Sequence, residues 1–162
     1  MACILSIQMT REWHAYSRYR WQGNGMHTLD TDDKGAPLLS RPSYISVDES
    51  GEVLYISEWR IDKVTKVSMT GKLISTHKTK NWDGLLGLIC VGQDQLLVSN
   101  CSGRSVDVVS EDCKTVGTLL DTTHGIQSPC ALCYCASQEI LYVSSNWDGK
   151  PKSLSVFKVA NK

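Results

Sequence analysis

The chain has 162 residues with 17 basic and 17 acidic side chains, so its formal net charge at pH 7 is zero. This balance excludes a global electrostatic attraction to nucleic acid, and no apolar run approaches the ~18 residues that a membrane-spanning helix needs. The segment from Met1 to Ile7 carries no basic side chain and its apolar run ends at Gln8, so we expect no signal peptide and a cytoplasmic location.

Short apolar strands bounded by turn residues are predicted along most of the chain. A first, less regular group comprises Ile4–Ile7, Tyr16–Tyr19 and Met26–Leu29. Eleven further strands follow in chain order: Tyr44–Asp48, Val53–Ser57, Lys63–Val67, Lys72–His77, Gly87–Val91, Gln95–Ser99, Ser105–Ser110, Lys114–Leu120, Ala131–Cys135, Ile140–Ser144 and Leu154–Val159.

One of these strands recurs at a nearly fixed interval. Leu54, Leu96 and Leu141 hold the same place in three similar apolar runs, 42 and 45 residues apart, and Pro42 and Pro129 precede the first and third runs by the same distance. Such spacing is typical of four-stranded propeller blades. The sequence therefore predicts an all-β fold, a partial β-propeller of four-stranded antiparallel blades. Its expected units are a remnant of a preceding blade at 1–40, blades at 41–80 and 81–126, and a C-terminal blade at 127–162 that lacks its outer strand.

The seven cysteines are odd in number and lie mostly in or beside predicted strands. We therefore expect packed thiols and no disulfide framework. Cys130, Cys133 and Cys135, with His124 upstream, have a spacing reminiscent of a metal site. Zinc, however, needs about four converging ligands, and a strand turns alternate side chains to opposite faces. We expect neither a metal nor another cofactor.

Catalytic motifs are absent from the sequence, and the predicted inner strands lack the His and Glu residues that a site in a propeller channel usually needs, so we expect no enzymatic activity. Loop residues are the better candidates for function, because aromatic and Arg side chains usually carry interface energy. The alternative for each candidate is an ordinary exposed loop residue. The candidate binding residues are Trp59, Arg60, Lys63, Asn100, Arg104, Asn146, Trp147 and Lys150. Trp82, in a second copy of the Asn-Trp-Asp-Gly sequence around Trp147, is expected either at the same face or packed between blades.

The repeat resembles a known family. Pro42-Ser-Tyr-Ile-Ser-Val-Asp48, the following segment from Gly51 to Arg60, Lys63-Val-Thr-Lys-Val67 and Gly71 resemble the NHL repeat. On this resemblance the chain holds about three and a half NHL-like repeats and is similar to the C-terminal part of the propellers in tripartite-motif proteins. In that family the propeller binds a substrate protein or, in some members, RNA, and closes as a ring. Ubiquitin-ligase activity would belong only to a longer parent bearing a RING.

Three functional readings follow from the residues and the resemblance. The first is a non-catalytic module that binds a protein partner through propeller loops. The second is an RNA-binding propeller, which would need Arg60, Lys63, Arg104 and Lys150 to form one basic surface. The mixture of cations and aromatics at 11–21 could also contact RNA, or could form an alternating strand. The third is a nonfunctional or truncated fragment. An open arc of blades exposes both terminal faces, so self-association to complete the ring is also expected to be possible.

Overall fold

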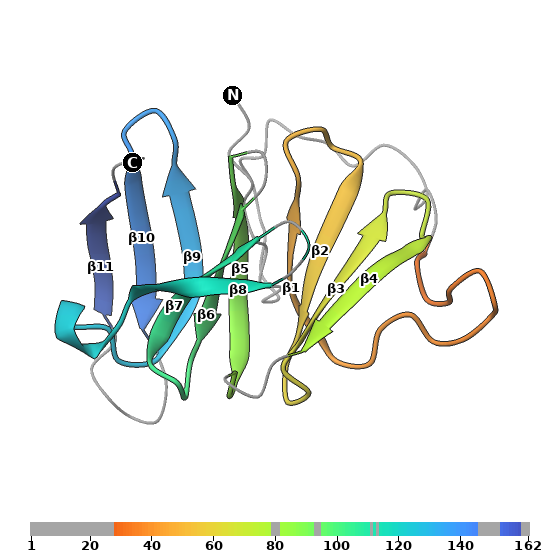
Figure 1. Ribbon diagram of the computed structural model, residues 1–162, viewed down its shortest axis with the longest axis horizontal. Coiled ribbons are helices and arrows are strands. Elements are labelled where there is room, and N and C mark those ends of the chain that lie inside the picture. The colour runs from red at the N-terminus through yellow and green to blue at the C-terminus, as the bar shows by residue number, and fades with distance from the viewer. Residues whose placement is uncertain are drawn as a thin grey trace, which may run out of the picture.

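The computed structural model describes residues 28–78, 82–92, 95–110, 112, 114–145 and 153–159. They form eleven strands and one short helical turn: β1 (Pro42–Val47), β2 (Val53–Glu58), β3 (Lys63–Ser68), β4 (Leu73–Lys78), β5 (Leu85–Val91), β6 (Gln95–Asn100), β7 (Ser105–Ser110), β8 (Thr115–Leu120), η1 (Thr122–His124), β9 (Pro129–Cys135), β10 (Ile140–Ser145) and β11 (Ser153–Lys158). The strands pair in chain order into two antiparallel sheets of four and one of three (Figure 1).

The eleven strands predicted in the region after residue 40 are all confirmed, with ends that differ by at most two residues. The largest difference is shared by β1, β5 and β9, which begin two residues earlier than expected. Each of these strands pairs with its neighbour through a register shift near its start, as at Pro42/Tyr44 and Leu85/Leu88. A bulge interrupts the alternation by which a strand is recognised in sequence, and proline is tolerated at the first residue of a strand.

The three sheets stand side by side in chain order, like neighbouring blades of a propeller (Figure 1). We call the face of a sheet that points toward the preceding sheet its leading face and the opposite one its trailing face. We call the first strand of each sheet, β1, β5 or β9, its inner strand. The inner strands make the contacts between sheets, since β5 packs against β1 and β2, and β9 packs against β5 and β6. The fold is therefore a partial β-propeller.

Apolar side chains fill the spaces between sheets. Tyr55 and Val64 from the trailing face of the first sheet pack with Leu88, Leu96 and Val98 from the second. A second cluster joins the second sheet to the third in the same way, through Leu97, Val106, Leu120, Ile126, Leu141 and Val143. Because the middle strands are covered on both sides, β2 and β6 are almost entirely buried, which explains their continuous apolar runs.

A hydrophobic residue stands three positions before each inner strand, at Leu39, Trp82 and Ile126. Trp82 and Ile126 are buried within the clusters between sheets, Trp82 with only 4% of its surface exposed. Of the two places considered for Trp82, the structure shows the one between blades. Leu39 packs with Leu38 against the leading face of the first sheet.

Several sequence predictions fall outside the described residues. These include the strands expected at Ile4–Ile7 and Tyr16–Tyr19, the first half of the one expected at Met26–Leu29, the aromatic and basic stretch at 11–21, and the loop residues Asn146, Trp147 and Lys150. The described half of Met26–Leu29, residues 28 and 29, lies in no strand. In the part of the chain that the structure covers, no helix is long and apolar enough to cross a membrane.

Candidate interaction surface

The loop between β2 and β3 and the loop between β6 and β7 lie at the same end of the sheets, the lower edge in Figure 1. Each consists of four residues, 59–62 and 101–104, placed between paired strand ends. The predicted binding residues Trp59 and Arg60 lie in the first loop and Arg104 in the second, while Lys63 and Asn100 are at strand ends. The structure thus brings these five residues to one edge of the partial propeller.

Trp59 and Arg60 form a stacked pair at the tip of the first loop. The Arg60 guanidinium lies 4.3 Å from the centroid of the Trp59 ring, a cation–π distance. Trp59 is half-buried and Arg60 is exposed. The Arg60 backbone is in the left-handed region with φ of 68°, as is Asp62 with φ of 49°, so the loop turns tightly and presents the arginine outward.

Glu58, the last residue of β2, fixes the base of this loop. Its side chain is fully buried, and its carboxylate accepts hydrogen bonds from Thr65 Oγ1 at 2.6 Å and from the backbone N–H of Ser40 at 2.7 Å and of Arg41 at 3.3 Å. The Lys63 ammonium completes the shell 2.7 Å from Glu58 Oε1. Burial raises the pKa of Glu58, but these hydrogen bonds outweigh burial and hold the pKa below its usual range.

Asp62 anchors the loop from its other end. Asp62 Oδ1 accepts a hydrogen bond from the backbone N–H of Leu85 at 2.9 Å, which ties the loop to the first residue of β5 in the next sheet. The backbone N–H of Trp59 donates to the carbonyl of Arg41 at 3.0 Å. The loop that carries Trp59 and Arg60 is therefore held at both ends and is preorganised.

Asn100 takes the place of Glu58 in the second sheet. It is buried, and its Oδ1 accepts hydrogen bonds from the backbone N–H of Asp83 at 2.9 Å and of Gly103 at 3.2 Å. A Cβ on Gly103 would lie 2.2 Å from Asn100 Nδ2, so any larger residue there would displace the Asn100 amide from its hydrogen bonds. The next residue, Arg104, is exposed and has a left-handed φ of 56°. Asn100 thus shapes the loop, and Arg104 projects from it.

The five described candidates therefore fall into two groups. Trp59, Arg60 and Arg104 offer surface to solvent, while Lys63 and Asn100 hold the loops in shape. The Lys63 ammonium is paired with a buried carboxylate and is 23% exposed, so it adds little net positive charge to the surface. Glu58 and Asp62 were missed by the sequence reasoning. Glu58 could have been noticed, because it is an ionisable residue in register with Asn100 at the end of an apolar run.

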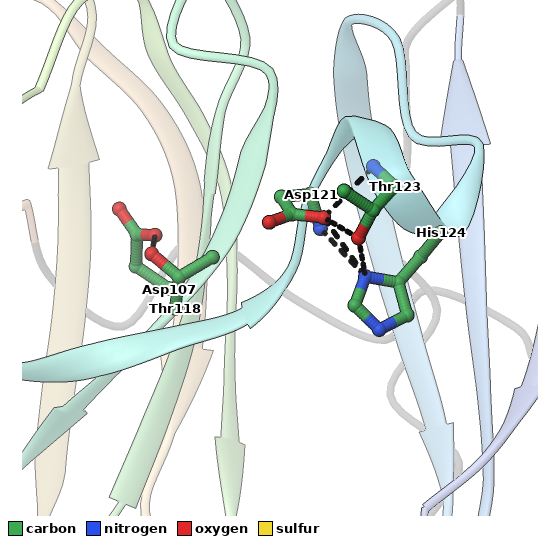
Figure 2. A network of polar contacts seen from close by, with 5 residues as sticks. All are labelled: Asp107, Thr118, Asp121, Thr123 and His124. Atoms are coloured by element: carbon green, nitrogen blue, oxygen red, sulfur yellow. Dashed lines mark hydrogen bonds and ion pairs between the residues drawn. The ribbon is translucent and has the colours of Figure 1, made fainter.

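A polar cluster near η1 has the residue types of a catalytic triad (Figure 2). His124 Nδ1 lies 2.9 Å from Asp121 Oδ1 and 3.2 Å from Thr123 Oγ1, so both oxygens meet the same ring nitrogen. A relay needs the nucleophile and the carboxylate on different nitrogens. Asp121 also accepts from the Thr123 N–H, and its pKa is lowered to about 2, chiefly by the Thr123 hydroxyl and then by His124. The group is a capping box at the start of η1.

The cysteine group Cys130, Cys133 and Cys135 lies on β9. Cys133 is exposed, and the other two are half-buried. Within the described residues, no three His, Cys, Asp or Glu side chains are placed to share a metal ion.

Solved structures share the fold. The chain is similar to hydrazine synthase of Kuenenia stuttgartiensis, with 18% identity and a TM-score of 0.61 over 72% of this chain and 34% of that one. It is also similar to a gluconolactonase of Xanthomonas campestris, with 17% identity and a TM-score of 0.54 over 69% of this chain and 39% of that one. The WD40 repeats of RRP9 match with 20% identity and a TM-score of 0.53 over 71% of this chain and 33% of theirs.

These likenesses establish the propeller fold and nothing finer. The chain covers between 33% and 39% of the solved chains that it matches. A scan against protein-family models and a search of curated proteins both find no match.

Proposed function

We propose that this chain is a non-catalytic recognition module that binds a protein partner through the loop edge containing Trp59, Arg60 and Arg104. The observation that carries the proposal is the stacked pair of Trp59 and Arg60. The loop that presents this pair is held at its base by the buried Glu58 carboxylate and is tied to the next sheet by the hydrogen bond that Asp62 accepts. Trp and Arg are the residues most enriched among interface hot spots, and a preformed loop loses little entropy on binding.

The left-handed backbone of Arg60 and Arg104 adds support. An L-residue in this conformation costs about 1–2 kcal/mol relative to glycine, so both loops place a long cationic side chain where glycine would be less strained. Sparsely populated backbone conformations are a recognised feature of binding sites. Both arginines are exposed, so they add a charged contact surface to the loop edge.

The finer identity is part of this proposal. The match of Pro42 to Gly71 to the NHL repeat supports an NHL-type propeller, and on that basis the chain would select the substrate of a tripartite-motif ubiquitin ligase carried by a longer parent. An RNA-binding role would draw on the same edge. Because Lys63 is neutralised by Glu58, the basic surface that RNA binding needs is reduced among the described residues to Arg60 and Arg104.

Partner capture with matched variants tests the proposal. Arg60→Gly removes the guanidinium and fits the left-handed backbone, so the variant is expected to keep its stability within ~1 kcal/mol. Trp59→Ala removes the ring. Met69→Ala is the control, since Met69 is 44% exposed in the turn after β3, at the opposite end of the first sheet.

We expect proteins captured by the wild-type chain to be lost, by a factor of 10 or more, with Trp59→Ala and Arg60→Gly and retained with Met69→Ala. Capture should persist at high salt and after RNase treatment, because a hot spot built on tryptophan depends little on counterion release. Capture that RNase abolishes would favour the RNA reading. Capture that both loop variants retain would remove this edge from consideration.

A further inference from the structure

The trailing face of the third sheet is apolar and uncovered. Leu154 on β11 pairs with Ser144 in the way that Val64 pairs with Ser57 and Val106 pairs with Ser99. Val64 and Val106 are fully buried by the following sheet, whereas Leu154 is 65% exposed. Val156, on the same face two residues further on, is 57% exposed. The third sheet therefore presents the surface that the first two sheets bury.

The leading face of the first sheet is uncovered along its inner strand. Ile45 on β1 pairs with Ile56 as Leu88 on β5 pairs with Val98. Leu88 is 5% exposed because the first sheet covers it, whereas Ile45 is 56% exposed. A cavity of about 320 Å³ lies beside Ile45, lined also by Pro42, Leu54 and Ile56. The two uncovered faces are thus the two halves of an interface that the chain already forms twice within itself.

Among the described residues before β1, 28–41, Leu29 and Leu39 border this cavity but leave Ile45 exposed. Leu38 and Leu29 pack against Leu54 and Val67, which lie on β2 and β3. Contacts between successive sheets are made by the inner strand of the following sheet, as β5 does on β1 and β2. Leu54 and Ile56, which correspond to Leu96 and Val98 in the second sheet, are already covered by this segment. The part of the leading face that is left open to a preceding sheet is β1, where Ile45 is exposed.

A serine hydroxyl forms a hydrogen bond across each of the two interfaces between successive sheets. Ser57 Oγ donates to the carbonyl of Leu86 at 2.5 Å, and Ser99 Oγ donates to the carbonyl of Cys130 at 2.7 Å, in each case across to the next sheet. Ser144 holds the third such place, and its hydroxyl reaches the carbonyl of Ala131 in its own sheet at 3.4 Å. The residue that corresponds to Leu86 and Cys130 at the other end of the chain is Ser43.

We propose that two copies of this chain associate head to tail, the trailing face of the third sheet of each copy packing on the leading face of the first sheet of the other. Two identical heterologous contacts related by a twofold axis close on themselves and leave neither face exposed. The six described sheets of the pair fall within the ~4 to 8 blades of known propellers.

The mass of the full chain in solution, measured by light scattering after size exclusion, tests the pair. We expect about twice the 18.0 kDa of one copy. Ile45→Asp and Leu154→Asp should each return the mass to that of a single copy, because each puts a charge into both contacts. Ile74→Asp is the matched control: Ile74 is 47% exposed on β4, the strand of the first sheet that lies farthest from β1, and this variant should remain paired. Circular dichroism verifies that each variant is folded.

Mixing the two variants makes the test specific for head-to-tail geometry. A mixed pair of Ile45→Asp and Leu154→Asp chains contains one contact with both charges and one contact with none, so mixing should restore part of the paired species. A tail-to-tail pair would survive Ile45→Asp, and that result would overturn the proposal. A wild-type chain that remains a monomer at ~100 µM, well above the Kd of a typical specific complex, would also overturn the proposal. That result would assign the two faces to another partner. Masses that keep growing with concentration would indicate an open array and would overturn the closed ring.

Discussion

Replacement of the buried carboxylate Glu58 by glutamine is expected to destabilise the fold strongly. Glutamine keeps the size of the side chain, but it removes the negative charge. It also places an NH₂ group against hydrogen-bond donors that face a carboxylate oxygen in the wild-type chain. The Lys63 ammonium, 2.7 Å from Glu58, loses its counter-charge. Removing one partner of a buried ion pair costs about 3–5 kcal/mol. Because Lys63 is 23% exposed and regains some hydration, we expect the lower end, about 3 kcal/mol.

Urea unfolding followed by circular dichroism, at one fixed protein concentration and pH 7, measures this loss. In thermal unfolding the same loss corresponds to about 6–12 °C for a chain of this length. Glu52→Gln is the matched control, since Glu52 is an exposed carboxylate just before the same strand, and its substitution is expected to stay within ~0.5 kcal/mol of wild type. If Glu58→Gln were no more destabilising than Glu52→Gln, the structural role assigned to the buried carboxylate would be refuted.

The effect of this substitution should depend on pH. Burial raises the pKa of Glu58, but the hydrogen bonds from Lys63, Thr65 and two backbone amides outweigh it, so the folded pKa is lowered. A group whose folded pKa is lowered contributes stability above its unfolded pKa, about 4.3 for Glu, and loses it as the pH falls through the folded value. The difference in free energy of unfolding between wild type and Glu58→Gln should therefore shrink below about pH 4.3. A difference that stayed constant down to about pH 2 would contradict the lowered pKa.

Two further substitutions test the contact between the second and third sheets, both measured by urea unfolding. Gly87→Ala should lower the free energy of unfolding by about 2 kcal/mol or more, because its Cβ would lie 2.2 Å from the carbonyl oxygen of Cys130. Gly117→Ala is the control and should be nearly neutral, because a Cβ there would meet no atom within 4 Å. Equal effects of the two substitutions would contradict the close approach of the two sheets at Gly87. Ser99→Ala removes the hydrogen bond to the same carbonyl and should lower the free energy of unfolding by about 1 kcal/mol. The control Ser137→Ala, at an exposed serine, should cause no measurable loss. A neutral Ser99→Ala would show that this hydrogen bond does not hold the sheets together.

The loop edge shows how far the sequence alone could lead to the site. Aromatic and Arg residues in loops at equivalent places of successive blades were enough to select Trp59, Arg60 and Arg104. Their loops, 59–62 and 101–104, lie at one end of the sheets (Figure 1). The sequence could not separate these from Lys63 and Asn100, whose side chains are engaged in holding the loops. That distinction depends on partners that are distant in sequence, such as the Ser40 amide for Glu58 and the Asp83 amide for Asn100.

The sequence by itself determined the strands, their grouping and the class of fold. These features rest on local physics, because turn residues, alternating apolar positions and a repeat of 42 to 45 residues each arise within one blade. Only the tertiary structure decided which side chains are buried. Val64, Val106 and Leu154 occupy the same place in similar strands, yet the first two are buried and the third is 65% exposed. Burial of a blade face depends on the neighbouring sheet, and that neighbour is not encoded in the strand itself.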